Sequence, residues 1–274
     1  MKMKYYFIVC FWMMAMMLQA QEQKELVILH TNDTHSRIEP LPATDFYNPG
    51  KGGVVNRKAV IDSVRAVNPL VILLDAGDFV QGTPYYNLFK GRVEVESMNR
   101  LGYDAVTIGN HEFDYGLDTL QMILKDLKCP VICCNYDFTG TPMEGMTQPY
   151  VILKKGDLKV GIVGVGIDPE GLIQKDKYEG MKFLPIMDTV NQYAEILKKK
   201  KKCDLVICLS HIGYEPDLKL AENSEFVDII IGGHSHTILD EPTIKQNLAG
   251  SEVLVYQVGG QGSHIGEVKV RFEK

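Results

Sequence analysis

Five short segments of the sequence place metal-binding side chains directly after apolar runs. In each case a run rich in β-branched residues is followed by polar, glycine-rich sequence that carries Asp, Asn or His. The polar segments are residues 31–35, 75–78, 109–114, 210–211 and 232–236. Ligands of open α/β sheets bind outside the carboxyl ends of the strands. The pattern therefore predicts that all of these segments meet at one edge of a sheet.

The side chains in these segments suit metal binding. The candidate ligands are Asp33, His35, Asp78, Asn110, His211, His234 and His236. Alternate residues of an extended chain project to the same side, so Asp33 and His35 suit a single ion, and His234 with His236 repeats this spacing. Asp78 has two carboxylate oxygens and is expected to bridge two ions. A mixed nitrogen and oxygen set without sulfur suits manganese, zinc, iron or cobalt better than calcium.

A pair of ions held in this way predicts phosphoryl chemistry. Two metals roughly 3.5–4 Å apart clamp the attacking and leaving oxygens of an in-line displacement, and a bridging water supplies hydroxide near neutral pH. His111 directly follows Asn110 and is expected to stabilise the phosphoryl group and to protonate the leaving alkoxide. Asp114 is expected to orient the His111 ring. Such acid–base help is typically worth about 10²–10⁴-fold in rate.

Each of these residues also has a structural alternative. Asp and Asn are favoured in turns because they bond to the backbone, and Asp114 would also serve as a helix N-cap. Several polar neighbours are expected to stay outside the chemistry: Asp75 as a structural acid, Glu112 facing solvent, and His30 packed at a strand end. The joint occurrence of the candidates after apolar strands favours the metal site.

The elements that must position the site follow from the apolar pattern. Strands are expected at residues 26–30, 70–74, 105–108, 131–134, 160–165, 205–209, 227–231, 253–258 and 265–272. Several are apolar at nearly every position, as in strands buried on both faces. Helical spacing relates Val60, Val64 and Val67, and also residues 117–127. Lysines 198–202 are expected to close a helix that begins near Asp188. Alternating strands and helices predict a layered α/β fold.

Composition and charge narrow the function. The 274 residues are 45% hydrophobic and 23% charged, which is typical of a globular protein. The net charge of −6 argues against nucleic acid as a partner. Residues 1–20 combine a basic start, an apolar run and Ala20 before polar sequence, which predicts a secretory signal peptide rather than a retained anchor. The mature domain is then residues 21–274, exported across the inner membrane to the periplasm and without a membrane span.

The cysteines favour a structural role. Removal of the signal peptide takes away Cys10 and leaves five cysteines, an odd number without the spacing of a disulfide framework. No Cys-x-x-Cys motif is present, which argues against a thiolate metal site. We therefore interpret them as small buried apolar residues.

Taken together, the motifs resemble a known family. The segments LHTNDTH (29–35), DAGD (75–78), GNHEFDYG (109–116), SH (210–211) and GGHSH (232–236) resemble the metallophosphoesterase domain of the 5'-nucleotidase family. The glycine pair at 52–53 also resembles the start of that family's first helix. The resemblance covers essentially the whole mature chain. It implies a four-layer α/β/β/α sandwich of the calcineurin-like type.

The resemblance also implies roles for single residues. The first metal would take Asp33, His35, Asp78 and His236. The second would take Asp78, Asn110, His211 and His234. His111 and Asp114 match the family's catalytic pair. Some relatives have Gln at position 236, so His236 is expected to alter metal preference.

Full-length relatives continue into a second domain that recognises the nucleotide, whereas this sequence ends at Lys274. We therefore expect either a separate recognition polypeptide as partner or broad specificity for phosphate esters. The leading hypothesis is a metal-dependent phosphomonoesterase acting on 5'-nucleotides. A 2',3'-cyclic-nucleotide phosphodiesterase, a UDP-sugar hydrolase and a non-catalytic metal- or phosphate-binding module are the alternatives.

Overall fold

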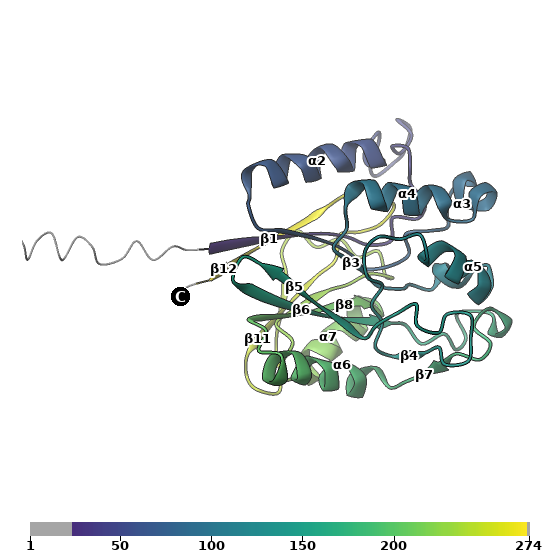
Figure 1. Cartoon of the computed structure of the whole chain (residues 1–274). Helices are drawn as coiled ribbons and strands as arrows, with labels where there is room; N and C mark the ends of the chain where they lie inside the picture. The colour runs from purple at the N-terminus through teal and green to yellow at the C-terminus, as the bar shows by residue number, and fades with distance from the viewer. Residues whose placement is uncertain (1–23, 273–274) are drawn as a thin grey trace, which may run out of the picture.

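The computed structural model describes residues 24–272, and Figure 1 shows the path of the chain. The expected signal peptide and Cys10 lie outside this range. Between Lys24 and Phe272, none of the helices combines the length and the apolar character needed to cross a bilayer.

Two β-sheets form the centre of the structure. The smaller sheet has the order β12-β1-β2-β3, and the larger sheet has the order β10-β11-β9-β8-β6-β5. The strands of the smaller sheet are β1 (Lys24–Thr31), β2 (Val71–Asp75), β3 (Ala105–Val106) and β12 (Gly266–Phe272). Those of the larger sheet are β5 (Tyr150–Lys155), β6 (Leu158–Gly166), β8 (Leu205–His211), β9 (Ile229–Ile231), β10 (Thr243–Gln246) and β11 (Glu252–Tyr256). Strands β4 (Tyr136–Asp137) and β7 (Lys182–Phe183) pair separately.

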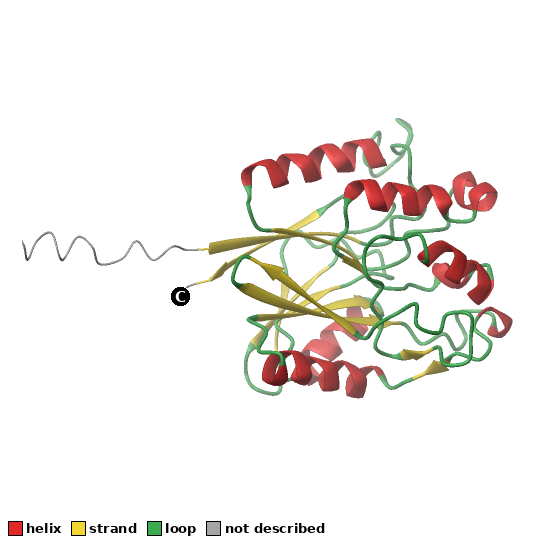
Figure 2. Cartoon of the chain, in the orientation of Figure 1, coloured by secondary structure: helices red, strands yellow, loops and turns green. Residues whose placement is uncertain are grey.

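The two sheets pack face to face between two layers of helices (Figure 2). In β1, Leu26 and Ile28 point into the core between the sheets, where they join residues of β6 and β8. The alternate residues Val27 and Leu29 pack against the helical layer on the other face. A third apolar cluster joins the outer face of the larger sheet to its own helices. The fold is therefore the expected four-layer α/β/β/α sandwich.

The helices divide between the two outer layers. Helices α2 (Val54–Val67), α4 (Arg92–Leu101) and α5 (Gly116–Leu124) contribute to the cluster on the smaller sheet. Helices α6 (Ile186–Glu195) and α7 (Tyr214–Asn223) contribute to the cluster on the larger sheet. The short α3 (Pro84–Phe89) and the 3-10 turns η1 (His111–Phe113) and η2 (Lys175–Lys177) lie in the connections. Helix α6 continues as a π-helical turn over Ile196–Lys200, so the lysines do close this helix.

The helix expected from the spacing of Val60, Val64 and Val67 is present as α2, but its valines do not form one buried face. Val60 is 48% exposed and Val67 is 78% exposed, whereas Arg57 and Ile61 are buried. The helix is present, but its inner face is turned relative to the valine pattern. Arg57 is buried there because its guanidinium donates to the backbone carbonyl of Arg37, in the loop that follows the site residues. The inner side of α2 therefore combines the polar contact of Arg57 with the apolar packing of Ile61 and Val64.

Most predicted strands are present, with different ends. Residues 131–134 are the exception, because Val131 and Ile132 make only isolated bridges to Val106 and Gln148. Strands β5 and β10 were not among the predicted strands, and both lie at the edges of the larger sheet. Strand β10 alternates half-buried and exposed residues and has one strongly apolar side chain, Ile244. Within the described chain all five cysteines are free, and all but Cys129 are buried, which agrees with their interpretation as apolar residues.

His30 is a buried, uncharged member of β1. It is fully buried, neither ring nitrogen has a hydrogen-bond partner among the described residues, and its ring meets Tyr256 at 6.1 Å. Its cross-strand neighbour is Gly266, where a Cβ atom would overlap the imidazole. Burial lowers the pKa of His30 to about 4. As expected, His30 packs at the strand end.

The buried His30 predicts acid sensitivity. Between pH of about 4 and 6.5, His30 is protonated in the unfolded chain but neutral in the folded one. The free energy of unfolding therefore falls as pH is lowered through this window. The shift corresponds to a loss of about 3 kcal/mol in the free energy of unfolding. His30→Leu should remove this contribution. Urea unfolding of both proteins at several pH values measures the difference, and parallel pH slopes would contradict the assignment.

Candidate metal centre

The site lies where strands of both sheets end. The carboxyl ends of β1, β2 and β3 come from the smaller sheet, and those of β8 and β9 come from the larger one. Backbone hydrogen bonds join the segments after β1 and β2, from the N–H of Asp33 to the carbonyl of Gly77 and from His35 to Asp78. The Nδ1–H of His211, at the end of β8, donates to the carbonyl of Ala76 at 2.6 Å. The predicted convergence of the five segments is thus present.

The ligand-bearing turns adopt an unusual backbone conformation. Asp33, His35, Asp78, His234 and His236 all have positive φ, between 46° and 72°. The expectation of an extended backbone at these residues is therefore wrong. Asp33 and His35 still lie in one cluster as expected, whereas His234 and His236 do not. Non-glycine residues at positive φ are uncommon, and such strain concentrates at functional sites. The turns curl these side chains inward instead.

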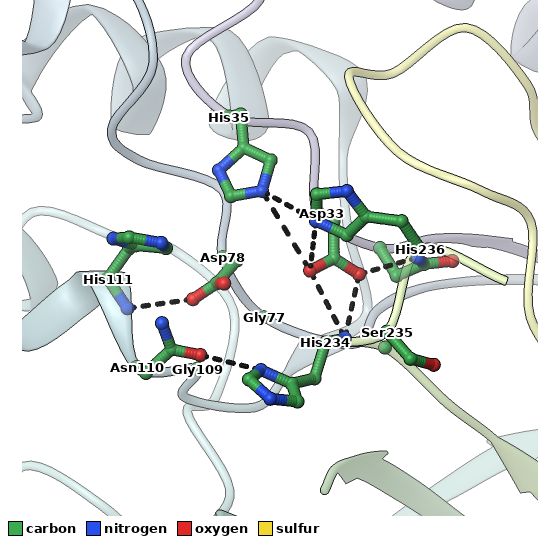
Figure 3. Close-up of polar contacts among 12 residues, drawn as sticks. Asp33, His35, Gly77, Asp78, Gly109, Asn110, His111, His234, Ser235 and His236 are labelled. Carbon is green, nitrogen blue, oxygen red and sulfur yellow. Dashed lines mark hydrogen bonds and ion pairs between the residues drawn. The ribbon is translucent and has the colours of Figure 1, made fainter. Parts of the chain in front are cut away.

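Asp33, His35 and His236 form one cluster at the upper part of Figure 3. The Nε2 atoms of the two imidazoles lie 3.0 Å apart. The Nε2 of His236 is 3.3 Å and that of His35 is 3.9 Å from Oδ1 of Asp33. Asp33 is fully buried and its carboxylate also accepts the backbone N–H of His234 at 2.9 Å. Three potential ligand atoms thus converge on one point.

Asp78, His211 and His234 form a second cluster, with Asn110 beside it. The Nε2 of His211 lies 3.2 Å from Oδ2 of Asp78. The Oδ1 of Asn110 lies 2.9 Å from Nδ1 of His234 and 3.3 Å from Nε2 of His211. His234 and His236 therefore fall in different clusters, contrary to the expectation from their spacing alone. The division agrees with the ligand sets that the family resemblance implies.

Asp78 also connects the second cluster with the first. The Asp78 carboxylate lies near His211 and His234, and it also lies near His35 and His111. Asp78 is buried, and its Oδ1 accepts the backbone N–H of His111 at 2.8 Å. Figure 3 shows its carboxylate between the two groups of ligands. This is the placement expected of a carboxylate that faces two sites.

The charges of the centre favour a bound cation. Burial lowers the pKa of His211, but the neighbouring Asp78 carboxylate outweighs burial and raises it to about 10. Burial alone would raise the pKa of Asp78, and the nearby imidazoles lower it instead. Two buried carboxylates thus create a field that attracts positive charge among nitrogen and oxygen donors. Such a set fits a divalent metal ion, and buried charges of this kind require a partner.

His111 and Asp114 lie at the mouth of the centre. Their side chains are 33% and 35% exposed, and Nδ1 of His111 lies 3.2 Å from Oδ1 of Asp114. The hydrogen bond to Asp114 raises the pKa of His111 above its ordinary value. A cavity of about 450 Å³ is lined by His111 together with the candidate ligands His35, Asp78, Asn110, His234 and His236. The cavity gives a substrate access to both the ligands and the imidazole.

Comparison with known proteins agrees with this geometry. Residues 26–237 match the sequence profile of the calcineurin-like phosphoesterases. The chain belongs to the calcineurin-like phosphoesterase family. Members of this family are phosphoric ester hydrolases, which confirms the enzyme class expected from the sequence. The 5'-nucleotidase of Bos taurus is 33% identical over 95% of this chain and 49% of its own length.

Solved structures support the fold of this phosphoesterase. The 5'-nucleotidase precursor from Thermus thermophilus superimposes with a TM-score of 0.85 at 34% identity, covering 91% of this chain and 52% of the other. The calcineurin-like phosphoesterase YfkN from Bacillus subtilis superimposes with a TM-score of 0.75 at 27% identity, covering 92% and 86%. The chain thus spans about half the length of the curated 5'-nucleotidases it matches.

The prediction that Glu112 faces solvent is wrong. This side chain of the phosphoesterase is fully buried, and its carboxylate accepts backbone N–H groups from residues 78–80 and from Gly109. Its position beside His111 in a polar, strand-end segment gave no signal of burial. Asp75, in contrast, is a structural acid as expected, because its carboxylate accepts from the Thr31 hydroxyl and from the N–H of Gly77.

The shared position of Asp78 predicts its effect on metal content. Asp78→Asn should remove the metal from both clusters, because the amide has one weaker oxygen donor in place of two charged ones. Asp75→Asn is the matched control, since Asp75 is a buried acid outside the ligand clusters and bonds to the Thr31 hydroxyl and the N–H of Gly77. Elemental analysis of the purified proteins measures the ions per chain. Metal content like that of the wild type in Asp78→Asn would exclude the shared role.

Proposed function

We propose that this domain hydrolyses phosphate monoesters, above all 5'-nucleotides, with two divalent metal ions. The observation that carries the proposal is the pair of ligand clusters on either side of Asp78, with His111 and Asp114 at the mouth of the same cavity. A single structural ion would need only one cluster. It would also need no partly exposed His–Asp pair beside it.

The ligand roles follow from the two clusters. Asp33, His35, Asp78 and His236 would hold the first ion, and Asp78, Asn110, His211 and His234 would hold the second. When bound, such ions supply positive charge to the phosphate oxygens and generate a nucleophile from water. The hydrogen bond from His211 to the Ala76 carbonyl leaves Nε2 free to face the centre. This second contact fixes the orientation of the imidazole, as outer partners of metal-binding histidines commonly do.

His111 would act on the substrate from the mouth of the cavity, where its side chain is partly exposed. With Nδ1 bonded to Asp114, its Nε2 is available to donate a proton to the leaving oxygen. The hydrogen bond that raises the pKa of His111 also favours the protonated ring that this step requires. Asp114 holds the ring in place and stabilises its charge. The chain thus provides a general acid for the leaving alcohol.

The organic part of the substrate would bind, and then depart, through the groove next to His111. Asn110, His111 and Leu172 line the central cavity and also a neighbouring groove of about 310 Å³. The rest of this groove is formed by Asp114, Ile173, Gln174 and Lys177. An apolar wall beside polar groups suits an alcohol that has both apolar and polar parts, such as a nucleoside.

Export and partnership are part of the proposal. The features of residues 1–20 support a signal peptide and a periplasmic location. The coverage of about half of each 5'-nucleotidase supports a nucleotide-recognition unit outside this domain. Assaying this chain with and without its candidate partner would show whether the domain is active alone.

A substrate panel tests the proposed function. We expect Mn²⁺-loaded protein to hydrolyse 5'-AMP and p-nitrophenyl phosphate, and to lose this activity in EDTA. Faster turnover of 2',3'-cyclic AMP or UDP-glucose would reassign the substrate within the same chemistry. A metal-loaded protein inactive on all four compounds, with or without the partner, would favour a binding module instead.

His111→Asn separates catalysis from metal binding. The variant should lower kcat by about 10²–10⁴-fold, because a positioned acid is lost, while metal content stays unchanged. Asp114→Asn should lower kcat less, because the imidazole remains. Steady-state kinetics on p-nitrophenyl phosphate and elemental analysis give the two readings. Loss of metal in His111→Asn would place this residue among the ligands.

A further inference from the structure

The buried carboxylate of Glu112 is held by backbone donors. Its Oε2 accepts the N–H of Asp78 at 3.0 Å and that of Gly109 at 2.6 Å. Its Oε1 accepts the N–H of Phe79 at 2.9 Å and, more weakly, that of Val80 at 3.4 Å. Both oxygens are therefore used. The donors come from two segments that are far apart in the sequence.

These two segments contain Asp78, whose carboxylate lies between the two ligand clusters, and the residues next to it. The first contains Asp78, at a φ of 55°, and the second continues from Gly109 into Asn110 and His111. A further bond from the N–H of His111 to Oδ1 of Asp78 joins the same two segments. At Gly109 a Cβ atom would overlap the Asp78 carboxylate, so the two chains approach as closely as glycine permits.

We propose that Glu112 is a positioning residue that fixes the Asp78 carboxylate between the two metal sites. The inference rests on the proposed function, because it requires Asp78 to serve both ions. A turn in the left-handed conformation directs its N–H groups inward, and buried N–H groups need acceptors. Glu112 accepts all of these donors with one rigidly held group. The Asp78 side chain is thereby held at a fixed angle to Asn110.

A comparable carboxylate at the other end of the sheet provides the control. Asp104 directly precedes β3, and its Oδ2 accepts the N–H of Leu73 at 2.8 Å. Its Oδ1 pairs with Lys155 at 2.9 Å. Asp104 therefore joins two chain segments as Glu112 does, but away from the carboxyl ends of the strands. Substitution of Asp104 reports the effect of losing such a contact on stability alone.

The experiment compares Glu112→Gln with Asp104→Asn in metal titrations of the demetallated proteins. Calorimetric titration with Mn²⁺, and separately with Zn²⁺, gives the affinities, and thermal unfolding without metal gives the stabilities. Glu112→Gln should weaken both binding events by about 10- to 100-fold, the usual effect of removing an outer partner of a metal site. Asp104→Asn should lower Tm but bind metal with the affinity of the wild type.

The outcomes separate this inference from the proposed function. Wild-type affinity in Glu112→Gln, even with a lowered Tm, would overturn the positioning role and leave the two-ion proposal intact. A wild-type protein that binds neither Mn²⁺ nor Zn²⁺ would overturn both. Should Glu112→Gln fail to fold, Glu112→Asp keeps the charge on a shorter side chain. Its metal affinity should fall as well, and an unchanged value would refute the inference.

Discussion

The structure of the site depends on two buried carboxylates that face imidazoles rather than lysine or arginine. Asp33 is 0% and Asp78 2% exposed, and the groups nearest to their oxygens are histidine rings, backbone N–H groups and, at Asp33, the side-chain amide of Asn32. Neutral imidazoles do not balance buried negative charge, and an unpaired buried charge is costly. Protonation of His211 would compensate part of it, which is why Asp78 raises the pKa of this histidine. A divalent cation balances the charge more completely and uses the same lone pairs.

The two-sheet architecture explains how this charge can be buried at all. The apolar clusters on both faces of each sheet hold the strands, so that only their carboxyl ends need polar partners. The smaller sheet contributes Asp33 and Asp78, while the larger sheet contributes His211 and the histidines after β9. Neither sheet has a full set of ligands. The site is therefore complete only where the two sheets pack against each other.

The sequence predicts the site more completely than the details of the fold, for physical reasons. Runs that are apolar at nearly every position indicate strands buried on both faces, and a polar residue directly after such a strand lies at its end. The face of α2 depends instead on the contact of Arg57 with the Arg37 carbonyl, which involves a loop distant in sequence. The burial of Glu112 likewise depends on N–H groups of residues 78–80, which only the folded chain brings to it. The periodicity of apolar residues indicates local secondary structure, but it does not reveal contacts between residues that are far apart in the sequence.

The solvent exposure of the side chains increases from the inner to the outer side of the candidate metal centre. Asp33 and His211 are fully buried, whereas the side chains of His111, Asp114 and His236 are 33%, 35% and 47% exposed. The ligands on the inner side are thus enclosed by the sheets, and solvent reaches the centre from the outer side alone among the described residues. A ligand that reaches the centre along the same path passes the exposed side chains of His111 and His236. The potential metal ligands are therefore enclosed on one side of the centre, while the cavity lined by His111 remains open on the other.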